Sequence, residues 1–182
     1  MSDHITRYDV MPIPPVEAQT RWFDVGSLRI GVEYRLLNEA IAAASATAPA
    51  EGFDSADLAG LDDRGVSLHV CGPVDGELRE LLRFDCFDED PHYHYVDWRA
   101  KSNEVLHLDP VADGDPLTWA LERLRTRLPQ MLARAGAPEA AGGFDANALE
   151  DTLPRVTQAA YRARYESDAE AVLRDALPED SR

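Results

Sequence analysis

Residues 78–109, LRELLRFDCFDEDPHYHYVDWRAKSNEVLHLD, carry the clearest structural signal in the chain. Apolar and polar residues alternate through 82–87, which is the pattern of a half-buried strand. Turn-forming residues fill 88–91, and the next segment, 92–98, is rich in the aromatic and β-branched residues that strands prefer. After a polar break, alternation returns in 104–109. The stretch therefore predicts three consecutive antiparallel strands.

The register of the first two strands determines which side chains share a face, because successive strand residues point to opposite sides of a sheet. A four-residue turn at 88–91 places Asp85 opposite His94. In this register, apolar and aromatic side chains gather on one face of the sheet. The other face is polar and carries Arg83 and His92 beside that pair.

Two further histidines can join this polar face. Pairing Leu68 with Leu82 aligns the apolar faces of their strands and places His69 on the polar side. His107 joins the same face only if the turn after Trp98 has an even number of residues. A five-residue turn sends it to the opposite face.

The polar face predicts a candidate metal site. Two histidines two residues apart on one strand can offer their imidazoles to one ion, and a carboxylate from the neighbouring strand completes a set that suits zinc or iron with an open coordination position. The candidate ligands are His92, His94 and Asp85, with His69 and His107 as additional candidates. The competing interpretation is a cross-strand ion-pair cluster without a metal.

The chain has 182 residues, of which 45% are hydrophobic, and this is most simply one domain with a real core. We find no apolar stretch of membrane-spanning length and no basic start followed by an apolar run. The two cysteines, Cys71 and Cys86, fit a reducing compartment. We therefore expect a cytoplasmic protein without a membrane segment.

The formal net charge is −16, from 34 acidic and 18 basic residues. Such a field repels phosphate backbones, so a basic protein surface is a better expected partner than a nucleic acid. Lys101 is the only lysine among the basic residues, for which a GC-rich genome is the simplest explanation. A salt-adapted cytoplasm or mimicry of a polyanion also fits the acidity.

We expect an α+β fold, in which an antiparallel four- to five-stranded meander over about 28–109 has helices from about 116–177 packed on one face. Residues 1–21 include three prolines and show no periodicity. They predict an extended N-terminal arm, followed by a single α+β domain over 22–182.

Strict alternation over 28–36 predicts a strand, with a helix through 28–46 as the main competing interpretation. A short alanine-rich helix is expected at 39–46, and a helical turn at 55–61. The glycines and proline of 72–76 predict the turn into the central stretch.

The clearest helix begins at Asp115, a natural N-cap, with Pro116 in the first helical position. Pro129 should kink this helix, and Gly136 and Pro138 should end it. Its apolar stripe at helical spacing consists of Leu117, Leu121, Leu124, Leu128, Met131 and Leu132. Residues 137–143 then predict a linker, and 147–177 a last helical region in which Pro154 marks a break or first turn.

One local resemblance involves the central stretch. The segment Arg83-Phe84-Asp85, followed by Pro91-His92-x-His94, a strand and a leucine-bearing helix, resembles the small TumE-type toxins of toxin–antitoxin loci over about residues 80–130. The resemblance implies a similar local topology. The chain differs from that family in its strong acidity and in lacking the longer histidine cluster, so no residue role is transferred.

Two function classes follow. Signatures of phosphate loops, dinucleotide sites, paired CxxC motifs, GxSxG elbows and HExxH helices are missing from the sequence. The first class is therefore an acidic partner-binding or regulatory module, for which no cofactor is expected. The alternative is a metal-dependent enzyme, in the first place a hydrolase, that uses one zinc or iron ion on the polar face. The sequence does not determine the oligomeric state.

Overall fold

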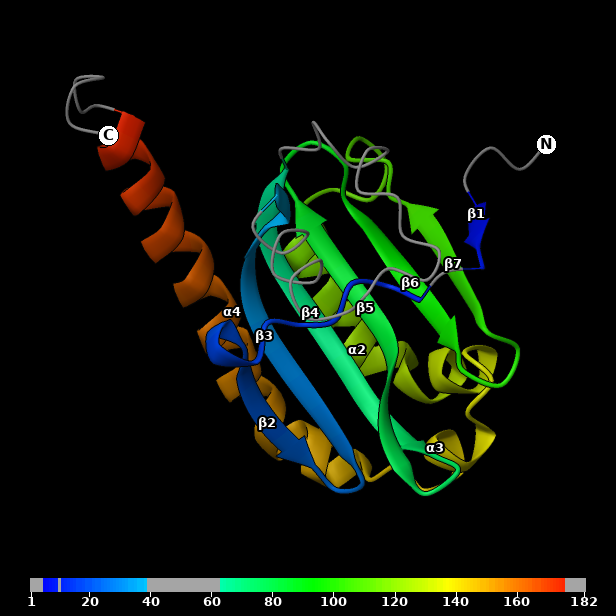
Figure 1. Ribbon diagram of the computed structural model, residues 1–182. Helices are drawn as coiled ribbons and strands as arrows, with labels where there is room; N and C mark the ends of the chain where they lie inside the picture. The colour runs from blue at the N-terminus through cyan, green and yellow to red at the C-terminus, as the bar shows by residue number, and fades with distance from the viewer. Residues whose placement is uncertain (1–4, 10, 39–62, 176–182) are drawn as a thin grey trace.

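A computed structural model of the chain describes residues 5–9, 11–38 and 63–175, with side chains described up to residue 167. In these ranges, seven strands form one antiparallel sheet and three α-helices lie against one of its faces (Figure 1). The fold is therefore α+β. Within the described ranges, no helix has both the length and the apolar character that crossing a membrane requires.

The elements follow one another in a simple order. The strands are β1 (Ile5–Tyr8), β2 (Arg21–Val25), β3 (Leu28–Leu36), β4 (Arg64–Val74), β5 (Glu77–Phe87), β6 (His92–Asp97) and β7 (Ser102–His107). A 3-10 helix, η1 (Glu17–Gln19), precedes β2. The α-helices are α2 (Pro116–Arg134), α3 (Pro138–Gly142) and α4 (Ala146–Asp175).

The strand order in the sheet is β1-β7-β6-β5-β4-β3-β2. Strands β2 to β7 are thus a meander, but the sheet has seven strands rather than the four or five predicted. The strand β1 was not predicted, because it lies in the proline-containing N-terminal segment. It pairs with the edge strand β7, where Ile5 lies opposite Leu106. A pairing between residues so far apart in sequence leaves no local pattern.

The β4–β5 hairpin is tighter than predicted. Its turn consists of Asp75 and Gly76 alone, with φ of 51° and 85°. Positive φ at both positions gives the turn type whose twist matches the strands, and Asp-Gly is a favoured sequence for it. Residues 72–74, expected in the turn, continue strand β4 instead.

The predicted strand registers are wrong by two residues. Asp85 lies opposite His92 rather than His94, and Leu68 lies opposite Phe84 rather than Leu82. Because the side-chain period of a strand is two, a shift of two residues leaves every side chain on its predicted face. The division into an apolar face and a polar face therefore holds.

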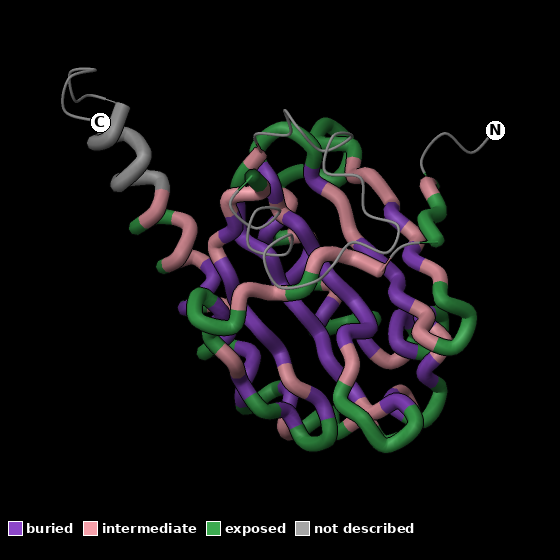
Figure 2. The backbone as a smooth tube through the Cα atoms, viewed as in Figure 1, coloured by how far each residue is buried: buried purple, intermediate pink, exposed green. Residues whose placement is uncertain are grey.

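The apolar face is covered by the helices. Its residues include Ile30, Val32, Leu68 and Val70, all of which are almost completely buried. Buried segments run along the central strands, as Figure 2 shows. Helix α2 packs on β5, and α4 packs on β2, β3 and β4.

Helix α2 confirms the predicted cap and stripe. The Asp115 side chain accepts a hydrogen bond from the Thr118 backbone N–H at 2.8 Å, and the helix runs through Pro129. Every residue of the stripe is buried. Gly136, with φ of 77°, follows the helix end.

Two predictions about the C-terminal region were wrong. The expected linker at 137–143 contains helix α3. Helix α4 begins at Ala146 and continues past Pro154, so this proline is neither a break nor a first-turn residue. The helix expected at 39–46 and the helical turn expected at 55–61 lie outside the described residues.

The packing of α2 gives a testable prediction. Leu124 is 0% exposed in the core, so Leu124→Ala should lower the free energy of unfolding by about 2–5 kcal/mol. Arg123 is a matched control, because its side chain is 30% exposed and its guanidinium lies over the Trp119 ring. Arg123→Ala should cost less than about 1 kcal/mol. Urea denaturation measures both, and equal losses would contradict this orientation of the helix.

Candidate metal site

A row of polar side chains crosses the sheet on the face opposite the helices. Strand pairing places Glu33, Ser67, Asp85, His92 and His107 directly beside one another on β3, β4, β5, β6 and β7. A parallel row runs next to it and contains His69, Arg83 and His94. The alternation of side chains along each strand thus places all five predicted candidate ligands on the polar face.

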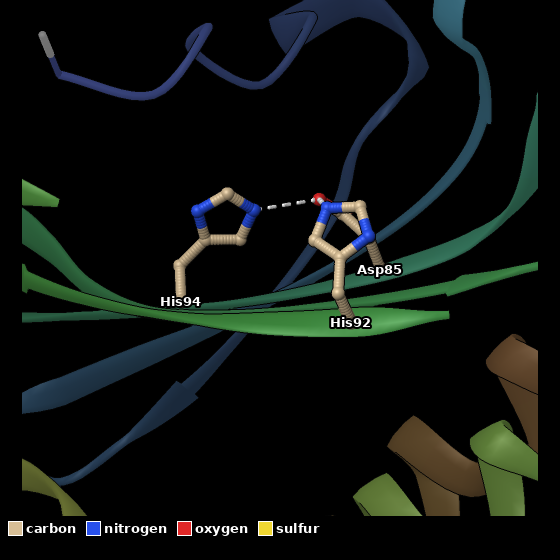
Figure 3. A group of neighbouring side chains, drawn as sticks. All are labelled: Asp85, His92 and His94. Carbon is tan, nitrogen blue, oxygen red and sulfur yellow. Dashed lines mark hydrogen bonds and ion pairs between the residues drawn. The ribbon is translucent and has the colours of Figure 1, made fainter. Parts of the chain in front are cut away.

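Asp85, His92 and His94 form a compact group on this face, with one potential ligand atom of each within 4.8 Å of the others (Figure 3). The Asp85 Oδ2 atom lies 3.4 Å from His92 Nε2 and 3.1 Å from His94 Nε2. Asp85 is 3% exposed and His94 is 7% exposed. The three side chains predicted as the principal ligands are therefore neighbours in a largely buried site.

Each of these three side chains also forms a hydrogen bond through an atom other than its potential ligand atom. Ser67 Oγ donates to Asp85 Oδ1 at 2.5 Å. His92 Nδ1 lies 2.7 Å from the Asp90 main-chain oxygen, and His94 Nδ1 lies 2.8 Å from Asn103 Oδ1.

These contacts determine which ring nitrogens are available. A carbonyl oxygen only accepts hydrogen bonds, so His92 must carry its proton on Nδ1. The same holds for His94 against the Asn103 oxygen. Both Nε2 atoms face Asp85: a charged ring donates a hydrogen bond from Nε2 to the carboxylate, whereas a neutral ring has its Nε2 lone pair available to an ion. A histidine whose Nδ1–H is held by an oxygen and whose Nε2 is free has the usual arrangement of a metal-ligating histidine.

The protonation equilibria favour the metal-binding state for Asp85 and His94, and oppose it for His92. Burial alone would raise the pKa of Asp85, but hydrogen bonds from His92 and His94 and the charge of Arg83 bring it well below its usual range. Burial lowers the pKa of His94 by more than Asp85 raises it. Burial would also lower the pKa of His92, but the hydrogen bond and charge of Asp85 raise it. The carboxylate is thus ionised and the His94 ring neutral, as metal ligands must be, whereas the raised pKa of His92 means that an ion must displace a proton from its ring.

A second group of potential ligands shares His92 and lies toward the surface. Asp90, His92 and His107 also have ligand atoms within 4.8 Å of one another. The turn between β6 and β7 consists of the four residues 98–101, so His107 lies on the polar face, where its Nδ1 is 2.7 Å from Asp90 Oδ1. The His92 proton on Nδ1 is directed to the Asp90 main chain, which leaves His92 to serve the deeper group.

His69 lies on the polar face but belongs to neither group. Its Nε2 is 3.0 Å from Glu33 Oε2, and its Nδ1 is 2.6 Å from Glu80 Oε1. Glu80 in turn accepts two hydrogen bonds from Arg83, at 3.0 and 2.6 Å. Both ring nitrogens of His69 are therefore engaged by carboxylates.

Glu80 was not among the predicted site residues. A register shift lies between Val70 and Cys71 of β4: Val70 lies opposite Leu82, whereas Cys71 lies opposite Glu80. Leu81 is the extra residue of this bulge, so Glu80 moves to the polar face. Leu81 and Leu82 are both buried. Two consecutive leucines in an otherwise alternating strand were the signal in the sequence that could have revealed the bulge.

The chain was compared with protein families, curated proteins and solved structures. A family model described as "Domain of unknown function (DUF7700)" matches residues 22–160. That range contains β2 from Trp22 onward, all of β3 to β7, α2 and α3, and every side chain of the candidate metal site. No curated protein and no solved structure matches the chain.

Proposed function

The chain belongs to the DUF7700 family, whose description assigns no activity, and from the geometry of its polar face we propose that it is a metal-dependent enzyme of the hydrolytic class. The ion is bound by Asp85 Oδ2, His92 Nε2 and His94 Nε2. The observation that carries the proposal is that each of these ligands is oriented by its own hydrogen bond, from Ser67, to the Asp90 main chain and to Asn103 respectively.

The number and kind of ligands support a catalytic rather than a structural ion. Structural zinc sites are usually closed by four protein ligands, whereas catalytic sites use three and leave one position for water or substrate. Two imidazoles and one carboxylate suit zinc, or non-haem iron as the alternative. Such an ion supplies a nucleophilic water at neutral pH and polarises a carbonyl or phosphoryl oxygen.

Exposure along the row indicates how solvent reaches the site. The side chain of Asp85 is 4% exposed, that of His92 15% and that of His107 35%. The exposure of the side chains to solvent therefore increases from β5 toward β7. The open coordination position would be approached from the side of Asp90 and His107.

Metal analysis of protein purified without a histidine tag tests this proposal. We expect about one zinc or iron ion per chain, and rebinding of one equivalent after chelation. The loaded protein, but not the chelated one, should hydrolyse one of a panel of activated carboxylic and phosphoric esters. Failure to bind a transition metal at neutral pH overturns the proposal, and stoichiometric binding without hydrolysis in the panel removes its catalytic part.

The net charge of −16 favours a second candidate, an acidic module that binds a basic protein surface. Association with such a partner should weaken as salt screens the charges. Pull-downs from lysate at low and high ionic strength measure this effect. Recovery of salt-insensitive partners alone would contradict electrostatic recognition.

A further inference from the structure

The part of the polar face around Arg35 and Arg83 is covered by the N-terminal segment. Residues 11–16, MPIPPV, run across the sheet on the side opposite the helices, between β1 and η1, as the blue trace of Figure 1 shows. We call these residues the crossing segment. It lies above two arginines of the sheet, Arg35 on β3 and Arg83 on β5, which are only 1% and 2% exposed.

The arginines contact the crossing segment through its main-chain carbonyls. Arg83 Nη2 donates to the Ile13 oxygen at 2.5 Å, and Arg35 Nη2 donates to the Pro14 oxygen at 2.7 Å. Both terminal nitrogens of Arg35 also lie 3.4 Å from the Ile13 oxygen. At the end of the segment, the Val16 N–H donates to Glu33 Oε1 at 3.4 Å.

The crossing segment has little else to hold it. Three of its six residues are prolines, which have no N–H to donate and so cannot form a strand ladder with the sheet. From Ile5 to Gln19, none of the described residues is buried. The residues beneath, by contrast, are almost completely buried. Because little apolar surface would be exposed, release of this segment should need much less free energy than global unfolding.

We propose that Arg35 and Arg83 form a binding site for the main-chain carbonyls of an extended, proline-containing peptide. The crossing segment occupies this site in cis. Departure of the crossing segment opens the metal site. The last part rests on the proposed function, whereas the peptide site does not. Proline-rich segments are suited to such recognition, because they are extended before binding and lose little conformational entropy.

Arg83 links the peptide site to the metal site. It lies directly opposite His94 in the β5–β6 pairing and opposite His69 in the β4–β5 pairing. A peptide held by Arg83 therefore passes beside the candidate ligands. The ligand class that fits this face is a polypeptide in an extended conformation.

A chain that lacks residues 1–16 tests the peptide site directly. It retains all of residues 22–160, the region matched by the family model, and thermal unfolding verifies that it is folded. The probe is a fluorescent peptide of residues 11–18, MPIPPVEA, followed by fluorescence anisotropy. We expect at least tenfold tighter binding to the truncated chain than to the full chain, in which the crossing segment competes in cis. A folded truncated chain that does not bind the peptide overturns the proposal.

Substitutions in the truncated chain test the two arginines. Arg35→Gln removes the donors to Pro14, and Arg83→Lys keeps a positive charge beside Glu80 but loses the forked guanidinium. Each should weaken peptide binding at least tenfold. Arg29→Gln is the matched control, because Arg29 lies on the same face but contacts Asp24 and Trp22 instead. Equal effects of all three variants would contradict recognition by Arg35 and Arg83.

The full chain provides a measurement that does not depend on truncation. Hydrogen exchange of the Val16 N–H, which donates to Glu33 Oε1, reports release of the crossing segment, and Arg35→Gln should accelerate it several-fold while Arg29→Gln leaves it unchanged. For the metal site, zinc transfer to a chelator should be at least tenfold faster from the truncated chain, and added peptide should slow it. Equal zinc transfer rates from the full and the truncated chain overturn only the claim that departure of the segment opens the metal site. A protein that binds no zinc overturns the proposed function, and the peptide-binding result does not depend on it.

Discussion

We expect His92→Ala and His94→Ala each to reduce zinc binding below detection in isothermal titration at neutral pH, while the protein stays folded. The physical reason is that, among the described residues, this group contains three side chains, so the loss of one imidazole leaves an incomplete site. Asp85→Asn should weaken binding less, because the amide oxygen can still coordinate although the charge is lost. Zinc affinity of the unmodified chain should also fall on acidification, since protons compete for the imidazoles.

Two kinds of control make this result specific. His107→Ala removes a histidine from the same row whose Nδ1 is engaged by Asp90, so it should leave zinc affinity nearly unchanged. Asn103→Leu and Ser67→Ala remove the groups that orient His94 and Asp85, and each should weaken affinity by about 10- to 100-fold. If His107→Ala abolished binding and His94→Ala did not, the ion would belong to the outer group around Asp90.

Glu80→Gln should be strongly destabilising, by about 3–5 kcal/mol at pH 7. The carboxylate of Glu80 is 9% exposed and bonded to both His69 and Arg83, so its neutralisation leaves a buried arginine without its main charge partner. Glu77 lies on the same strand with its side chain 65% exposed. Glu77→Gln is the matched control and should change the free energy of unfolding by less than about 0.5 kcal/mol.

The contribution of Glu80 to the free energy of unfolding should decrease as the pH falls. Burial would raise the pKa of Glu80, but the charges of Arg83 and His69 and their hydrogen bonds outweigh it and lower the pKa from 4.5 to about 2. A depressed pKa in the folded state contributes stability above pH 4.5 that is lost as the pH falls toward 2. The contribution is of the order of 3 kcal/mol. Urea denaturation between pH 7 and pH 2.5 should show this loss in the unmodified chain and a much flatter profile in Glu80→Gln.

Most of the sheet and the clustering of the site residues could be predicted, because the face on which a strand residue lies depends only on whether its position along the strand is odd or even. Alternation in 82–87 and an even turn at 88–91 place Asp85 and His92 on one face in any register that differs by two residues. That is why Asp85, His92 and His94 were grouped correctly although the predicted pairing was wrong. The helix α2 was also predictable, because its cap and its stripe are local signals at fixed spacing.

The remaining features depend on contacts that leave no periodic signal. The bulge at Leu81 interrupts the alternation of faces within β5, so that Glu80 lies on the polar face beside His69 and Arg83. Ser67 and Asn103 contact the candidate metal ligands Asp85 and His94 only because β4 and β7 lie beside β5 and β6.

The N-terminal segment is the clearest case of such dependence. Its composition predicts an extended chain, but its place on the polar face is set by Arg35 and Arg83, which follow it by about 20 and 70 residues in the sequence. Local patterns encode the direction in which each side chain points along its own strand. Which strands meet, and what covers the face that they form, is determined by free energies of packing and hydrogen bonding between segments far apart in the chain.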